Sequence, residues 1–163
     1  MAAHETFVAR EDGYGLLGLR SVDELVEATF APELGMLGTS LRCKSVELLH
    51  RQRSLVAFAT ERCLQGIPFL HPWATRLSAF QYPARDRTVN LYSDDPHLLL
   101  DENGMPNHGL QVGVHPWEVI EHVAGDEAAV LRALCRWHPQ RATFDRFPFA
   151  HDVEIVVRLQ GRR

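Results

Sequence analysis

Residues 67–77 read IPFLHPWATRL and place two prolines, a histidine, a tryptophan and an arginine among apolar side chains. Each proline removes a backbone hydrogen-bond donor, so neither a strand interior nor a helix interior suits this stretch. The composition instead indicates a rigid segment that carries an aromatic ring and ends near an arginine. Because a guanidinium is a planar fork of donors, we expect the arginine to face a polar partner.

The sequence on both sides of this segment favours an all-β fold. Short β-rich runs alternate with Gly, Pro, Asp and Asn, which is typical of an antiparallel sandwich or barrel. One segment, residues 52–64, has apolar residues near the helical period and ends at Gly66, so it predicts a short helix. We expect one domain over residues 1–163, with one or two short helices. The expected strands cover residues 6–10, 14–20, 25–31, 37–42, 45–49, 77–82, 88–92, 117–124, 128–137 and 153–159.

Composition limits the classes of function. Hydrophobic residues make up 45% of the 163 residues and charged residues 23%, which are globular values. The net charge of −4 and the scattered arginines argue against a nucleic-acid surface. We find no apolar run long enough to span a membrane and no basic, apolar leader at the N-terminus. Three distant cysteines, Cys43, Cys63 and Cys135, form no CxxC pair and indicate free thiols. We therefore expect a cytoplasmic protein.

The nine histidines raise the question of a metal site. His108, His115 and His122 are seven residues apart, which would align them on a helix, but Gly109, Gly113 and Pro116 make a helix there implausible. On a strand, odd spacings alternate between faces. No HxH, HExxH or Cys/His pattern occurs. We expect no bound metal and no cofactor, and the spacing also disfavours a metal-binding barrel of the cupin type.

Motifs for covalent catalysis and phosphate binding are also missing from the sequence. The chain has no GxSxG elbow, no GxxxxGK[ST] loop and no GxGxxG turn. The neighbouring acids Asp94-Asp95 and Asp101-Glu102 could form a glycosidase pair, but acids in turn-rich sequence are usually solvated. We expect these four carboxylates to be exposed.

Two phrases remain as candidates for a ligand site. One is HPWATRL at residues 71–77, and the other is LLLDENGMPNHGL at residues 98–110, where turns precede His108. Donors on a planar fork together with an aromatic face suit a neutral polyol. For each residue alone, a structural role is the more common one.

Four phrases in order carry a resemblance to a known family: ELGMLGTSLRCKSVELLH, GIPFLHPWATRL, DENGMPNHGL and FPFAHDVEIVVRL. Together, from about residue 34 to 159, they resemble the N-terminal half of the aldose 1-epimerase (galactose mutarotase) family. The resemblance implies a β-sandwich that is part of a larger supersandwich, and a sugar cleft lined by Arg76. His108 matches an active-site histidine that touches the sugar near its reacting end. Thr75 stands where the family usually has Asn, so a shorter hydroxyl replaces an amide.

The resemblance implies an isomerase that interconverts the α and β anomers of an aldohexose such as glucose or galactose. In the family, a His-Pro-Tyr phrase in the second half supplies the general acid and a late glutamate the base. Neither phrase occurs in these 163 residues, so we expect a chain truncated at its C-terminus. The alternative is a non-catalytic carbohydrate-binding remnant that keeps Arg76 and His108. Either form could associate with a second copy or with a complementing C-terminal half.

Overall fold

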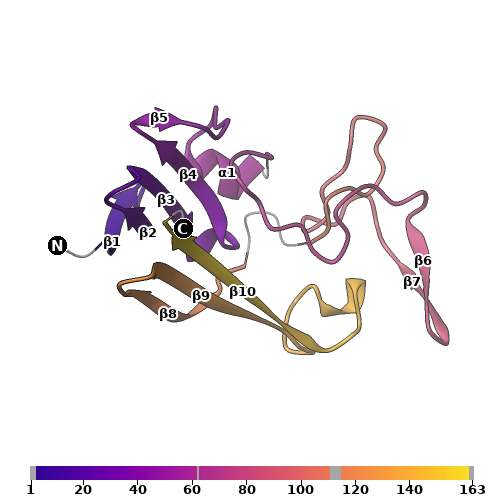
Figure 1. The fold of residues 1–163 in the computed structure, drawn as a ribbon. Coiled ribbons are helices and arrows are strands. Elements are labelled where there is room, and N and C mark those ends of the chain that lie inside the picture. The colour runs from indigo at the N-terminus through magenta and orange to yellow at the C-terminus, as the bar shows by residue number, and fades with distance from the viewer. Residues whose placement is uncertain (1–2, 62, 111–114, 162–163) are drawn as a thin grey trace.

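The computed structural model describes residues 3–61, 63–110 and 115–161 and shows two antiparallel sheets that face each other (Figure 1). In each sheet, strands that are neighbours in sequence are also neighbours in space. The first sheet consists of β1 (His4–Glu11), β2 (Tyr14–Ser21), β3 (Val26–Ala31), β4 (Leu37–Cys43) and β5 (Val46–Glu47). The second consists of β8 (Glu118–Ala124), β9 (Ala128–Trp137) and β10 (His151–Gln160), in the order β10-β9-β8.

The main core lies between these two sheets. Leu19 of β2 and Phe30 of β3 pack with Leu131 and Ala133 of β9, and Trp117 belongs to the same cluster. Because side chains alternate along a strand, only one face of each strand reaches this core. The register between β9 and β10 is unbroken from His151↔Trp137 to Gln160↔Ala128. Apolar burial of this kind contributes about 1.5–3 kcal/mol for each large side chain.

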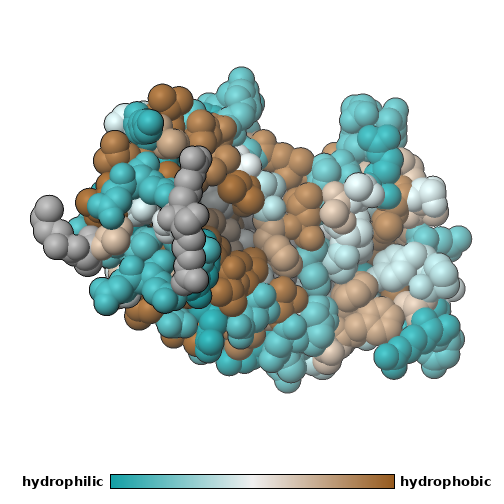
Figure 2. Space-filling model, in the orientation of Figure 1, coloured by the Kyte–Doolittle hydropathy of each residue, from teal (hydrophilic) through white to brown (hydrophobic). Residues whose placement is uncertain are grey.

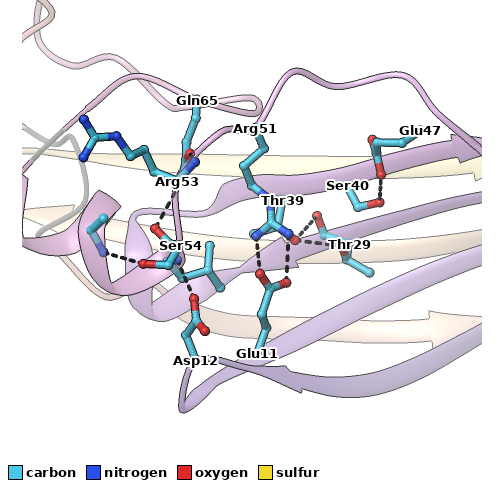
Figure 3. A network of polar contacts seen from close by, with 12 residues as sticks. Glu11, Asp12, Thr29, Thr39, Ser40, Glu47, Arg51, Arg53, Ser54 and Gln65 are labelled. Atoms are coloured by element: carbon cyan, nitrogen blue, oxygen red, sulfur yellow. Dashed lines mark hydrogen bonds and ion pairs between the residues drawn. The ribbon is translucent and has the colours of Figure 1, made fainter.

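The opposite face of the five-stranded sheet is covered by helix α1 (Leu55–Glu61). Leu55 and Phe58 of the helix pack against Leu16 and Leu37 of the sheet. A polar network fixes the start of the helix to the turn between β1 and β2 (Figure 3). There the Asp12 carboxylate accepts a hydrogen bond of 2.7 Å from the backbone N–H of Leu55. The helix is therefore held at its N-terminus and along one apolar face.

A third apolar cluster lies beside the sandwich, beneath the long loops. The hairpin of β6 (Gln81–Ala84) and β7 (Arg87–Asn90) supplies Ala84 and Val89, which pack with Leu110 and Trp137. Two short 3-10 turns, η1 (Pro32–Leu34) and η2 (Phe144–Arg146), complete the regular structure of the described residues. None of the helices in those residues has the length and apolarity to cross a bilayer.

The strand predictions agree with the structure in type at each expected position. The boundaries differ most at residues 77–82, where only residues 81 and 82 belong to a strand. The expected helix over 52–64 is shorter, because residues 52–54 and 63–64 lie outside α1. The all-β prediction with one or two short helices is confirmed.

The prediction that four neighbouring acids are exposed is wrong for two of them. Asp95 is buried and forms an ion pair of 2.6 Å with Arg146, and the side chain of Asp101 is only 1% exposed. Turns bring backbone N–H groups and arginines to both carboxylates, which replaces the hydration they lose.

Candidate functional site

The proline-rich segment of residues 67–77 forms no regular strand and lies beside residues 105–110. Backbone bridges join His71 to Gly109 and Arg76 to Asn107. The Leu77 N–H donates to Pro106 O at 2.8 Å, and the Leu110 N–H donates to His71 O at 2.6 Å. The two phrases singled out in the sequence are therefore neighbours in space.

His108 lies directly against the residue before Arg76. Its backbone N–H donates to Thr75 O at 3.2 Å, and its ring Nδ1 is 2.7 Å from Ala74 O. A carbonyl oxygen can only accept, so Nδ1 carries the proton. In the neutral ring, Nε2 is then left with a lone pair that can accept a hydrogen bond from a ligand. Thr75 and Arg76 are exposed and His108 is half-buried.

The backbone conformation at this point depends on Gly109. His108 and Gly109 both have positive φ angles, of 58° and 76°. A Cβ atom at Gly109 would lie 2.1 Å from His71 O, which is far inside van der Waals contact. Only glycine permits this approach, so the His-Gly pair fixes the ring of His108 against residues 71–75.

Arg76 has carboxylate partners on the neighbouring loop. Its Nε is 2.9 Å from Asp101 Oδ2, and its Nη2 is 3.6 Å from Glu102 Oε1. Hydrogen bonds from the backbone N–H of Met105, then of Asn103, and the charge of Arg76 lower the pKa of Asp101, against the effect of burial. The Asp101 carboxylate thus stays charged and orients a guanidinium whose side chain is 56% exposed. Donors of Arg76 on the exposed side face solvent.

A second polar pair lies among aromatic rings and was not predicted. His71 Nε2 is 2.8 Å from His151 Nε2, and the ring of His71 also contacts Trp137 and Phe147. Burial, followed by the charges of His151 and Arg141, lowers the pKa of His71 to about 4. His71 is thus neutral near pH 7. The HPW phrase in the sequence pointed to His71 as a residue of interest. Nothing in the sequence linked His71 to His151, which lies 80 residues later.

Other histidines have separate partners. His138 Nε2 is 2.7 Å from Asp152 Oδ1, and His122 Nε2 is 2.9 Å from Gly18 O. Among residues 3–61, 63–110 and 115–161, no three His, Cys, Asp or Glu side chains are grouped as metal ligands would be. Four surface cavities of about 340 to 630 Å³ are lined by other residues than Thr75, Arg76 and His108.

Comparisons with known proteins give solved structures of similar fold. A galactose mutarotase-like protein from Clostridium acetobutylicum superposes with a TM-score of 0.77 at 14% identity, over 96% of this chain and 45% of its own. A galactose 1-epimerase from Lactobacillus acidophilus gives 0.69 at 14% identity, over 98% and 45%. A protein from Synechocystis gives 0.67 at 23% identity, over 96% and 45%. No family model and no curated protein matches the sequence.

These likenesses extend over nearly the whole chain, whereas the chain spans less than half the length of each of the three proteins. At such identities, the shared property is the path of the backbone. The 163-residue chain has the galactose mutarotase-like fold.

Proposed function

We propose that the chain is the sugar-binding part of an aldose 1-epimerase-type isomerase, with Thr75, Arg76 and His108 facing the sugar. The observation that supports the proposal is the backbone contact between His108 and Thr75, the residue before Arg76, which brings the two phrases of the sequence together. The fold is that of a galactose 1-epimerase and a galactose mutarotase-like protein, which supports an aldohexose as the ligand.

The roles of the three residues follow from their donors and acceptors. The lone pair on His108 Nε2 would accept a hydrogen bond from a sugar hydroxyl. The outer N–H groups of Arg76 would donate to sugar oxygens, while Asp101 holds the other side of the guanidinium. The Thr75 hydroxyl can both donate and accept. As the titratable member of the three, His108 is the proposed catalytic residue.

Anomer interconversion requires two proton transfers. The proton on the anomeric hydroxyl must leave while the ring oxygen gains one, and ring closure reverses both steps. Each positioned acid or base typically contributes a factor of about 10²–10⁴. Arg76 does not release its proton in a protein, and Thr75 is not acidic enough. These three residues therefore supply one proton-transfer group, and a second must come from elsewhere.

The second candidate function is carbohydrate binding without catalysis. It is favoured because Thr75, Arg76 and His108 supply a single proton-transfer group, whereas anomer interconversion needs two. A cytoplasmic location belongs to both proposals, since Cys43, Cys63 and Cys135 are free thiols.

Titration of the chain with galactose and glucose, followed by calorimetry or NMR, tests binding. Polarimetry on freshly dissolved α-anomer tests catalysis. Binding without any acceleration supports the second candidate, and acceleration, even if weak, that is lost in His108→Ala supports the first. If neither sugar binds, both proposals are wrong.

A further inference from the structure

Strand β10 forms an open edge of the three-stranded sheet. It pairs with β9 along all ten residues, and no other strand of the described residues pairs with its far side. Natural edges are commonly interrupted by proline or by a bulge. The other edge strand of this sheet, β8, has a bulge between Val119 and Glu121, whereas β10 contains no proline and keeps an unshifted register. Thus β10 is a long, regular strand with free backbone groups.

The side chains of β10 that face the core are only partly buried. Val153, Ile155, Val157 and Leu159 pack against the main core, yet each keeps part of its surface exposed. Their neighbours on β9, which share the same face one strand further in, are fully buried. Figure 2 shows hydrophobic residues at the surface near the middle of the molecule. A strand added beside β10 would cover the exposed parts of Val153, Ile155, Val157 and Leu159.

The exposed face of β10 is self-complementary. It carries Glu154 and Arg158 at equal distances from Val156. When two copies of β10 run antiparallel about a two-fold axis at Val156, each Glu154 lies opposite an Arg158, and the two Val156 side chains lie opposite each other. On the core face, Ile155 then lies opposite Val157. A shift of two residues in either direction would place Val156 opposite a charged side chain instead.

The ion pairs of Glu154 and Arg158 within their own chain are long. Glu154 is 3.8 Å from Arg132, and Arg158 is 3.7 Å from Glu127 and donates from Nε to Gln160 Oε1 at 2.9 Å. The side chains of Glu154 and Arg158 are nevertheless 48% and 51% exposed. Opposite charges directly across two strands stabilise the pairing, and like charges oppose it. The two charged side chains are therefore available to a second strand.

From these observations we propose that β10 is a dimerisation edge, which pairs antiparallel with β10 of a second copy about Val156. The two three-stranded sheets then become one continuous sheet of six strands, in the order β8-β9-β10-β10-β9-β8. Backbone hydrogen bonds hold the two copies together, while the Glu154–Arg158 pairs set the register. The proposal is independent of sugar binding.

The first experiment measures the mass of the 163-residue chain by light scattering over a range of concentrations. We expect a dimer, at twice the 18.5 kDa of one chain. Glu154→Arg and Arg158→Glu each create like-charge pairs, so each should weaken dimerisation by about tenfold or more. The double variant exchanges the two charges, restores both pairs across the axis, and should recover the dimer. Circular dichroism checks that each variant is folded.

The second experiment tests the register by disulfide formation. Residues directly opposite in an antiparallel pair have Cα atoms about 4.5–5.5 Å apart, which a disulfide can bridge. Val156→Cys, in a background with Cys43 and Cys63 changed to Ser, should therefore cross-link two chains on oxidation. The matched control Glu154→Cys should not, because two copies of residue 154 are far apart in this register. A monomer at all concentrations, or a dimer unaffected by the charge changes and not cross-linked through residue 156, overturns the proposal.

Discussion

His71 and His151 face each other with their Nε2 atoms 2.8 Å apart. His151 Nδ1 is 2.6 Å from Phe149 O, so that nitrogen carries a proton. His71 Nδ1 is buried without a hydrogen-bond partner among the described residues. A charge on His71 would therefore be buried close to the ring of His151.

Stability should fall as the pH is lowered through the range in which His71 would become charged. The pKa of His71 is about 4 in the fold against 6.5 in the unfolded chain, so the unfolded state binds more protons between these values. The free energy of unfolding should thus decrease from pH 6.5 to pH 4, by up to about 3 kcal/mol from this residue. Denaturant titrations at several pH values measure it.

The matched variants for this test are His71→Phe and His50→Gln. His71→Phe removes the titrating ring and should flatten the pH dependence between pH 4 and 6.5. His50 is exposed, so His50→Gln should leave the dependence unchanged. An unaltered slope in His71→Phe would show that other groups cause the acid sensitivity.

Replacing Gly109 by alanine should destabilise the candidate site more than the same change in a nearby turn. Gly109 and Gly104 have almost equal φ angles, 76° and 75°, but a Cβ at Gly104 meets nothing within 4 Å. Gly104→Ala should therefore cost only the left-handed backbone penalty of about 1–2 kcal/mol. Gly109→Ala should cost clearly more, because His71 O must move. Equal losses in thermal unfolding would mean that the loop yields without resistance.

Arg76→Lys should weaken sugar binding although the charge is kept. Lysine cannot hold Asp101 and a sugar oxygen with two sides of one planar group, so we expect affinity to fall about fivefold to tenfold. Arg10 is exposed on β1, away from the candidate site, and Arg10→Lys is the control. Calorimetry with galactose measures both. Unchanged affinity in Arg76→Lys would remove Arg76 from the site.

His108→Ala should reduce any acceleration of mutarotation by the chain, with kcat falling more than KM rises. The reason is that a proton-transfer group acts mainly in the transition state. Because one such group is proposed here, the starting activity of the 163-residue chain should itself be weak, and polarimetry measures it. Strong activity that survives His108→Ala would assign the chemistry to other residues.

Much of the fold could be predicted because strands have a local signature. The alternation in residues 128–137 and 153–159 follows directly from one face of each strand meeting the core. The exposure of the four neighbouring acids, Asp94, Asp95, Asp101 and Glu102, shows the limit of this reasoning. Whether Asp101 is solvated depends on Arg76, which lies 25 residues earlier and approaches through loop geometry. Likewise, nothing local in the sequence indicates that His71 meets His151, because their contact depends on how loops cross the end of β9.

The order of strands in the two sheets has a consequence for synthesis on the ribosome. Strands β1 to β5 pair with sequence neighbours, so their sheet can form from local contacts as soon as about 50 residues have emerged. Leu19 and Phe30, however, are covered mainly by residues of β9, which are made much later. Throughout this interval the nascent sheet presents an uncovered apolar face. Chaperone binding to the growing chain should therefore be strongest between completion of β5 and the emergence of β9.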